Sequence, residues 1–223
     1  MKLASFSEGG PILAAWDYVS RSHRPVIVLP DGCRDLIVGC DPATGARKLL
    51  FSNLDAAPQT VVLPAGKQLA GLRLRVGVTL PPLVIDELRR ELERPSGDAE
   101  PGLVGQVVTA HAELNDDLLE AIAAGRTVLR AARHLGASER TLHRRMLART
   151  GRPPSFWLDL ARARRALACL STGMTLAEIA IEAGYADQAH FTRSFGARFG
   201  APPGSFRSQP ALMRLAALPG FSG

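Results

Sequence analysis

The chain has 223 residues, 46% of them hydrophobic, and a formal net charge of +6. This length allows one large domain or two small ones. The chain holds no run of eighteen apolar residues and its start lacks the apolar core of a signal peptide, so we expect a cytoplasmic protein without a membrane span. The three cysteines (Cys33, Cys40 and Cys169) lack the paired spacing of a zinc site, so reduced thiols are expected.

The charge is distributed unevenly along the chain. Residues 1–125 carry 12 Lys/Arg and 16 Asp/Glu, whereas residues 126–223 carry 15 Arg and 5 Asp/Glu. A basic segment that follows a mildly acidic one predicts a polyanionic partner for the C-terminal part alone.

The N-terminal part reads as a series of strands. Short apolar or alternating runs are separated by turn signals such as Pro30-Asp31-Gly32 and Pro64-Ala65-Gly66. Strands at this spacing indicate a small antiparallel barrel or sandwich. The predicted strands are 12–19, 26–29, 35–39, 48–52, 60–63 and 69–76.

Helical spacing begins at residue 83. Residues 83–92 place Leu83, Val84, Leu88 and Leu92 on one side of a predicted helix. Residues 94–102 are polar and rich in helix breakers, which is typical of a linker. A short helix at 103–113 and a firmer one at 116–124, with Asn115 as its N-cap, are expected to follow. The predicted domains are 1–95, a linker region at 96–114, a second domain at 115–210 and a tail at 211–223.

The C-terminal third repeats itself. Residues 127–156 match residues 175–206, first at an offset of 48 (Thr127 and Thr175) and then at an offset of 49 (Arg144 and Arg193). Each copy has the form helix, glycine turn, helix, which predicts two helix-turn-helix units in tandem. Such units place a helix in a DNA groove.

In the second copy Thr175 and Glu178 form a capping box, and Asp187 caps the next helix. Phe191, Phe195 and Phe199 recur on one face of that helix and are expected in the core. In the first copy, Val128, Ala132 and Leu135 are expected to face inward, Ser138 to cap, and Leu142 and Met146 to anchor the second helix. The outward positions are then Glu139, Arg140, His143 and Arg144 in the first copy, and Gln188, Ala189, Thr192 and Arg193 in the second.

Arginine suits these outward positions because its planar fork can donate two hydrogen bonds to guanine. A single arginine also fits a solvated surface or a phosphate contact; the matched pair Arg144 and Arg193 favours base contacts. Between the copies, residues 155–171 predict a helix about 25 Å long. Its apolar stripe is Leu160, Ala163, Leu167 and Leu170, with Arg162, Arg164 and Arg165 mostly on the other sides. Such a spacer allows one chain to enter two successive major grooves.

These residues carry a resemblance to a known family. RARRALACL at 162–170, TLAEIA at 175–180, DQAHFTRSF at 187–195 and FGAPPGSFR at 199–207 resemble the DNA-binding domain of AraC/XylS transcription regulators. The resemblance covers about 115–207 and implies a seven-helix domain with two helix-turn-helix units joined by a long helix. It departs from the family pattern at Ala189, which can only pack on a thymine methyl, and in a first copy that is unusually basic and poor in aromatics. The implied DNA-binding residues are Arg140, His143, Arg144, Gln188, Ala189, Thr192 and Arg193.

A weaker resemblance covers the N-terminal part. PDGCRDLIV at 30–38 and GLRLR at 71–75 are similar to the β-rich domain of some AraC-type regulators. The resemblance implies a cupin-like barrel that binds an effector, supports dimerisation, or does both. The expected fold class is therefore α+β, with a β-rich, barrel-like domain followed by an all-α domain. Trp16, Tyr18 and the apolar strands either line a small-molecule cavity or fill the barrel.

We therefore expect a sequence-specific DNA-binding transcription regulator, not an enzyme, controlled by a signal sensed in the N-terminal domain. Its candidate partners are double-stranded DNA, a small-molecule effector, a second copy of the chain and RNA polymerase. No catalytic residue, metal or cofactor is expected. Asp31 and Asp35 lie four apart around Cys33 as a candidate metal or acid/base pair, but Pro30-Asp31-Gly32 is first of all a turn. The alternatives are a thiol-based alkyl acceptor or redox sensor that uses Cys33, with Cys40 as its redox partner, and a DNA-binding protein whose N-terminal domain only oligomerises.

Overall fold

The computed structural model describes residues 2–5, 10–23, 25–41, 43–94 and 102–216. The chain forms two compact units. The β unit comprises Met1–Val26, Cys33–Asn53 and Thr60–Leu114, and the helical unit comprises Ile27–Gly32, Leu54–Gln59 and Asn115–Gly223. Residues 95–101 of the predicted linker and 217–223 of the predicted tail lie outside the described residues.

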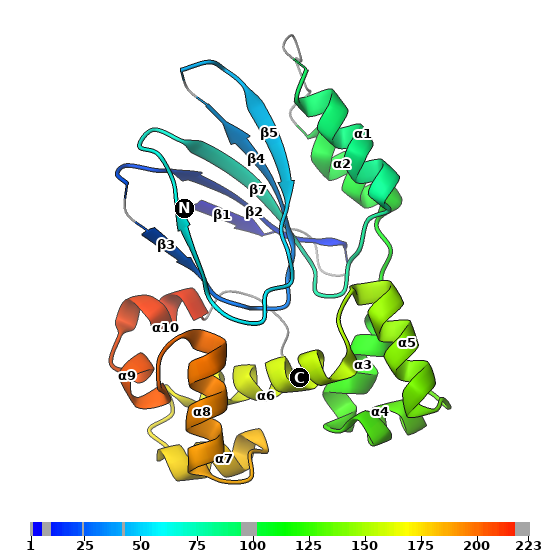
Figure 1. Ribbon diagram of the computed structural model, residues 1–223, viewed down its shortest axis with the longest axis vertical. Coiled ribbons are helices and arrows are strands. Elements are labelled where there is room, and N and C mark those ends of the chain that lie inside the picture. Colours follow the sequence, from blue (N-terminus) through cyan, green and yellow to red (C-terminus); the bar gives the residue numbers. More distant parts are fainter. Residues whose placement is uncertain (1, 6–9, 24, 42, 95–101, 217–223) are drawn as a thin grey trace. The chain divides into compact units, whose positions relative to one another are not determined.

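An antiparallel five-stranded sheet is the framework of the β unit (Figure 1). Its strand order is β1-β2-β7-β4-β5, and β3 and β6 form a separate two-stranded sheet. This arrangement confirms a β-rich N-terminal part and an α+β fold. The strands are β1 (Lys2–Ser5), β2 (Ile12–Val19), β3 (Pro25–Val28), β4 (Asp35–Cys40), β5 (Arg47–Phe51), β6 (Gln59–Val62) and β7 (Gln68–Leu74).

A register shift in β2 decides which side chains face the core. Ile12 lies opposite Leu74, but Ala14 lies opposite Arg73, so one residue is bulged between them. Because a bulge reverses the alternation of faces, Ile12 shares the core face with Leu74 whereas Trp16 lies on the opposite face, opposite Gly71.

Two helices cover the core face of the sheet: α1 (Pro82–Leu92) and α2 (Leu103–His111). Leu88 and Leu92 of α1 and Val108 of α2 are buried in one cluster with the inner residues of the sheet. The helix α2 falls in the region expected as a linker, and its packing places it in the β unit.

Most of the predicted elements of this part are confirmed within two residues, because alternation and turn residues are local signals. The strand β1 was not predicted. The placement of Leu83 on the inner face of α1 is wrong: this side chain is 75% exposed. Leu83 lies in the first turn, directly after Pro81 and Pro82, and Ile85 packs on the core in its place.

The helical unit contains seven helices between residues 116 and 207, as the family resemblance implies, and an eighth after them. Ala216 of this last helix is 4% exposed in the core, so the predicted tail begins inside the fold. The helices are α3 (Asp116–Gly125), α4 (Val128–His134), α5 (Glu139–Thr150), α6 (Pro154–Cys169), α7 (Leu176–Ala183), α8 (Gln188–Phe199), α9 (Pro203–Arg207) and α10 (Pro210–Ala216).

The long helix α6 is the centre of this unit, and helices of both repeats pack on it. Its predicted apolar stripe is confirmed but is too narrow, because Trp157 and Ala161 are also buried, at 0% and 1% exposure. The indole Nε1 of Trp157 donates to Thr150 Oγ1 at 3.0 Å, which satisfies a buried donor. The helix is therefore a core element of both repeats as well as a spacer between them.

Asn115 occupies the N-cap position of α3, but its side chain makes no capping bond. Its backbone (φ −124°, ψ 38°) does not have the extended geometry of a capping residue, and the side chain is 1% exposed. Its Oδ1 instead accepts from Arg149 Nη1 at 3.5 Å, so Asn115 joins α3 to the end of α5.

Candidate nucleic-acid interface

The first helices of the two repeats begin in the same way. Thr127 Oγ1 accepts from the backbone N–H of Arg130 at 3.2 Å, and Thr175 Oγ1 accepts from that of Glu178 at 3.3 Å. The backbone N–H of Thr175 in turn donates to the carboxylate of Glu178, and this reciprocal pair of hydrogen bonds confirms the predicted capping box. The bonds from the backbone and the hydroxyl of Thr175 lower the pKa of Glu178.

The second helices also match. Ser138 Oγ accepts from the N–H of Thr141 at 3.1 Å at the start of α5, and Asp187 Oδ1 accepts from the N–H of His190 at 2.6 Å at the start of α8. In the turn before α8, Gly184 has a φ of 84°, a conformation that favours glycine. The sequence repeat is therefore a repeat of local structure, and both second helices start at fixed residues.

The inner faces of α5 and α8 are buried in the core of the helical unit. Leu142 and Met146 of α5 are both 0% exposed. In α8, Phe195 is 0% exposed and its ring lies 4.6–5.5 Å from those of Phe191, Phe199 and Phe206. Burial of these side chains fixes how each helix is rotated about its own axis. In the first helix α4, Ala132 is buried as predicted, whereas Val128 and Leu135 are only half-buried and Ala131 supplies the remaining contact.

Six of the seven predicted DNA-binding residues are exposed. Thr192 is the exception: it is half-buried, and its hydroxyl donates to the backbone oxygen of Gln188 at 2.8 Å. This bond leaves Thr192 only an acceptor for another group. The exposed residues are Arg140, His143 and Arg144 on α5, and Gln188, Ala189 and Arg193 on α8.

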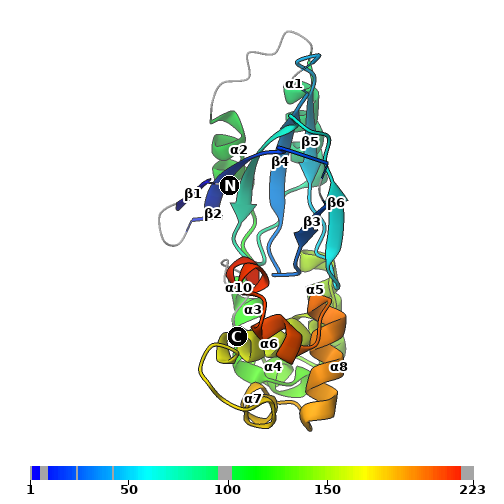
Figure 2. The ribbon, with the colours of Figure 1, turned by 90° about the vertical axis from the view of Figure 1, so that its left-hand side faces the viewer.

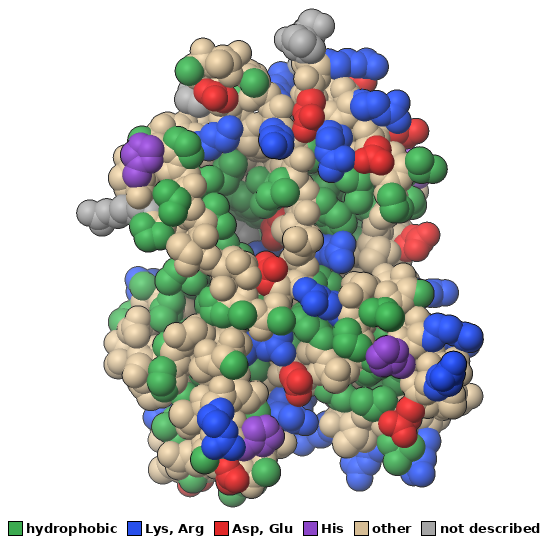
Figure 3. Space-filling view, in the orientation of Figure 1, with side chains coloured by type: hydrophobic (Ala, Val, Ile, Leu, Met, Phe, Trp, Pro, Cys, Tyr) green, Lys and Arg blue, Asp and Glu red, His purple; other side chains and the backbone are tan. Residues whose placement is uncertain are grey.

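The exposed faces of α5 and α8 can contact one partner at the same time. Figure 2 shows α5 and α8 on the same side of α6, and Figure 3 shows Lys and Arg side chains on the helical lobes. Among the described residues, neither Arg144 nor Arg193 lies in an ion pair. Both guanidinium groups therefore remain able to bind an outside acceptor.

Sequence reasoning missed a further basic feature next to these helices. Arg152 and Arg198 both lie over the ring of Phe156, with their Cζ atoms 5.1 and 5.2 Å from its centroid. Burial lowers the pKa of Arg198. Because the three residues come from the turn before α6, from α6 itself and from the end of α8, no spacing in the sequence connects them.

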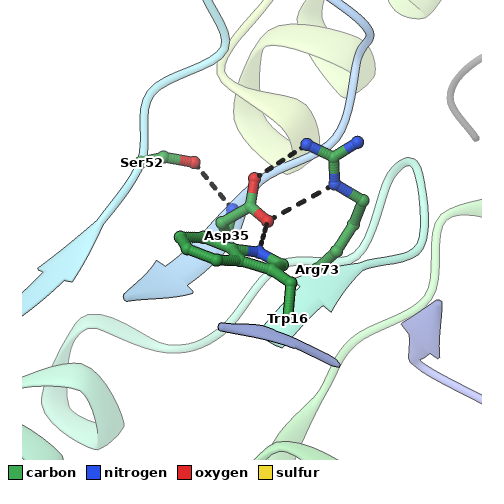
Figure 4. A network of polar contacts seen from close by, with 4 residues as sticks. All are labelled: Trp16, Asp35, Ser52 and Arg73. Carbon is green, nitrogen blue, oxygen red and sulfur yellow. Dashed lines mark hydrogen bonds and ion pairs between the residues drawn. The ribbon is translucent and has the colours of Figure 1, made fainter. Parts of the chain in front are cut away.

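In the β unit, Asp35 has a structural role (Figure 4). Its Oδ1 accepts from Trp16 Nε1 at 2.8 Å and lies 3.4 Å from Arg73 Nε, and its backbone N–H donates to Ser52 Oγ at 2.7 Å. These bonds join β2, β4 and β7 on the face opposite α1 and α2. Within the described ranges, no three His, Cys, Asp or Glu side chains gather as metal ligands would, and Asp31 and Asp35 form no such site.

None of the three cysteines, which all lie in the described part of the chain, forms a disulfide. Cys33 is 5% exposed and Cys40 is half-buried. A thiol that accepts an alkyl group must be accessible and activated, so the burial of Cys33 gives the thiol-based alternatives no support. Across the described parts of the chain, no helix is both long and apolar enough to cross a membrane.

Comparison with known proteins finds a match for part of the helical unit. Residues 131–209 match the model of a helix-turn-helix domain, and no curated protein matches the chain. Among solved structures, ToxT from Vibrio cholerae O395 has 12% identity and a TM-score of 0.46, with 92% of this chain and 98% of that chain covered. A 1.65 Å structure of ToxT from Vibrio cholerae has 10% identity and a TM-score of 0.46, covering 87% and 97%. Residues 131–209 of the chain are therefore similar to a helix-turn-helix domain, and this segment runs through both repeats, from within α4 to the end of α9.

Proposed function

We propose that this protein is a sequence-specific transcription regulator that reads DNA with α5 and α8. One observation carries the proposal: two structurally repeated helices bury their apolar faces completely and leave Arg144 and Arg193 exposed at equivalent positions. A helix held in this way presents a fixed polar face, which is what a major groove accommodates.

The length of α6 fits two successive grooves. Its 16 residues span about 24 Å at a rise of ~1.5 Å per residue. Helices packed near its two ends can approach the ~34 Å that separates successive major grooves on one side of a duplex. A single chain then contacts two half-sites about 10 base pairs apart.

The exposed side chains have different roles in this proposal. Arg144 and Arg193 bind guanine through two hydrogen bonds each, and Gln188 suits adenine. Ala189 packs on a thymine methyl, and Thr192 contributes its remaining acceptor. Arg140 and His143 extend the face of α5. The basic charge of residues 126–223 supplies affinity for phosphate that does not depend on sequence.

Selection of bound fragments from random duplexes by the full-length protein tests this function. We expect enrichment of a site with two conserved blocks about one helical turn apart, and binding that weakens steeply with salt. Failure to enrich any sequence, with DNA bound equally well whatever its sequence, would refute specific reading.

We further propose that the β unit senses a small molecule. The sheet face opposite α1 and α2 carries an aromatic ring, Trp16, beside the Asp35–Arg73 pair, whose side chains are 12% and 14% exposed. An apolar surface with a few converging polar groups is typical of small-molecule sites. A metabolite that binds only the folded protein must raise its melting temperature, whereas a β unit that only oligomerises gives no such shift in any screen. Dimerisation and contact with RNA polymerase remain predictions.

A further inference from the structure

A group of arginines lies between the two helix-turn-helix units. Arg162 and Arg165 are one helical turn apart on α6, the helix on which both repeats pack. Arg126 follows α3 directly, at the start of the first repeat. Figure 3 shows Lys and Arg side chains in the notch between the helical lobes. The charges of Arg126 and Arg162 both act on Arg165, and we call these three residues the notch arginines.

Arg165 and Arg162 are half-buried, whereas Arg126 is exposed. The Nε of Arg165 is buried and has no hydrogen-bond partner among the described residues. Burial and then the charges of Arg126 and Arg162 lower the pKa of its guanidinium, and these effects outweigh the opposing ones of Tyr185 and Glu182. Like charges are therefore held together beside a buried donor, an arrangement that an anion would relieve.

The other two notch arginines differ in what holds them: Arg126 has a strained backbone, and Arg162 makes specific side-chain contacts. Arg126 has a φ of 56° and is the only described residue other than glycine with a positive φ. Most side chains avoid this conformation, so the fold holds an arginine where glycine would be more stable. Arg162 lies with its Cζ 5.5 Å from the ring centre of Tyr185, and its Nη1 lies 3.5 Å from Asp159 Oδ1.

We propose that the notch arginines bind the DNA phosphates between the two major grooves that α5 and α8 enter. When two helices on one side of a duplex occupy successive major grooves, the minor groove between them faces the protein. The phosphate strands that border this minor groove then meet the notch. The inference rests on the proposed function, and it assigns to α6 a direct part in binding.

This role differs from that of Arg144 and Arg193. A phosphate contact carries no sequence information, so the notch arginines must strengthen binding to every duplex by the same factor. Each phosphate neutralised adds about 0.9 to the slope of log affinity against log salt concentration. The notch arginines therefore contribute to the affinity for any duplex, and they favour binding in which α5 and α8 occupy successive major grooves.

The test measures binding of the full chain to its selected duplex and to a scrambled duplex, over a range of salt concentrations. We expect Arg165→Gln to weaken binding to both about tenfold and to lower the salt slope by about 0.9. Arg165→Lys keeps the charge and should retain most of the affinity. Arg90→Gln, at an exposed position of α1, is the control for loss of one positive charge and should change neither quantity.

A second experiment uses duplexes in which the central phosphates are replaced by neutral methylphosphonates. These replacements should weaken binding of the wild type more than binding of Arg165→Gln, because the variant has already lost one of the three phosphate contacts. Arg126→Gly should weaken DNA binding while raising Tm by about 4 °C, because it relieves the backbone strain. This variant keeps the test valid if a change at Arg165 impairs folding.

The outcomes separate the inference from the function on which it rests. A wild type that selects no sequence refutes the function itself. A wild type that selects a sequence, with Arg165→Gln and Arg126→Gly binding as tightly as it does, refutes only the notch contact. A loss that depends on the base sequence of the central segment would also overturn the inference, because it would indicate reading of the minor groove.

Discussion

Replacement of Phe195 by alanine tests the packing that orients α8. The ring is 0% exposed and contacts three other aromatic rings at 4.6–5.5 Å. Removal of a buried phenylalanine ring costs about 3–5 kcal/mol, and the rigid aromatic surroundings favour the upper half of that range. A loss of about 4 kcal/mol is a large fraction of the total stability of a small domain.

Urea unfolding monitored by tryptophan fluorescence measures this loss, because Trp157 is buried in α6 of the same unit. Trp16 reports on the β unit, so replacing it by phenylalanine isolates the signal of the helical unit. The matched control is Leu147→Ala on α5, which is 49% exposed and should cost below 1 kcal/mol. A loss below 1.5 kcal/mol for Phe195→Ala, at unchanged m, would show that the aromatic cluster does not hold α8.

Three further predictions concern local structure. Gly184→Ala should cost about 1–2 kcal/mol in urea unfolding, because its φ of 84° is unfavourable for alanine although no atom lies within 4 Å; an unchanged midpoint would contradict this. Because the folded pKa of Glu178 is depressed, its contribution to stability is complete above the ordinary carboxyl range and disappears as pH falls through the folded pKa. Thermal unfolding between pH 6 and about 3 should therefore depend less on pH in Thr175→Ala than in the wild type. Gly71→Ala places a Cβ in overlap with the ring of Trp16, so the ring must move away from Asp35 and the fluorescence of Trp16 should shift.

The sequence predicted best what is encoded locally. The caps Thr175 and Asp187 and the spacing of Phe191, Phe195 and Phe199 each depend on residues within one or two turns, and the structure confirms them. The strands were found for the same reason.

Features that arise from contact between distant segments could not be predicted. The periodicity of α6 showed one stripe, whereas both repeats pack on this helix and bury Trp157 and Ala161 as well. The hydrogen bond of Thr192 to its own helix depends on a rotamer and leaves no trace in spacing. The notch joins Arg126 to Arg165 across 39 positions, and only the fold brings them together.

The central claim is that Arg144 and Arg193 read bases. The most direct measurement compares the affinities of the wild type, Arg144→Ala and Arg193→Ala for the selected duplex and for a scrambled one at the same salt concentration. Each variant should lose about 1–3 kcal/mol on the selected site, a factor of roughly 5 to 150, and much less on the scrambled site. Equal losses on both duplexes would contradict the account, because they would make these arginines phosphate contacts.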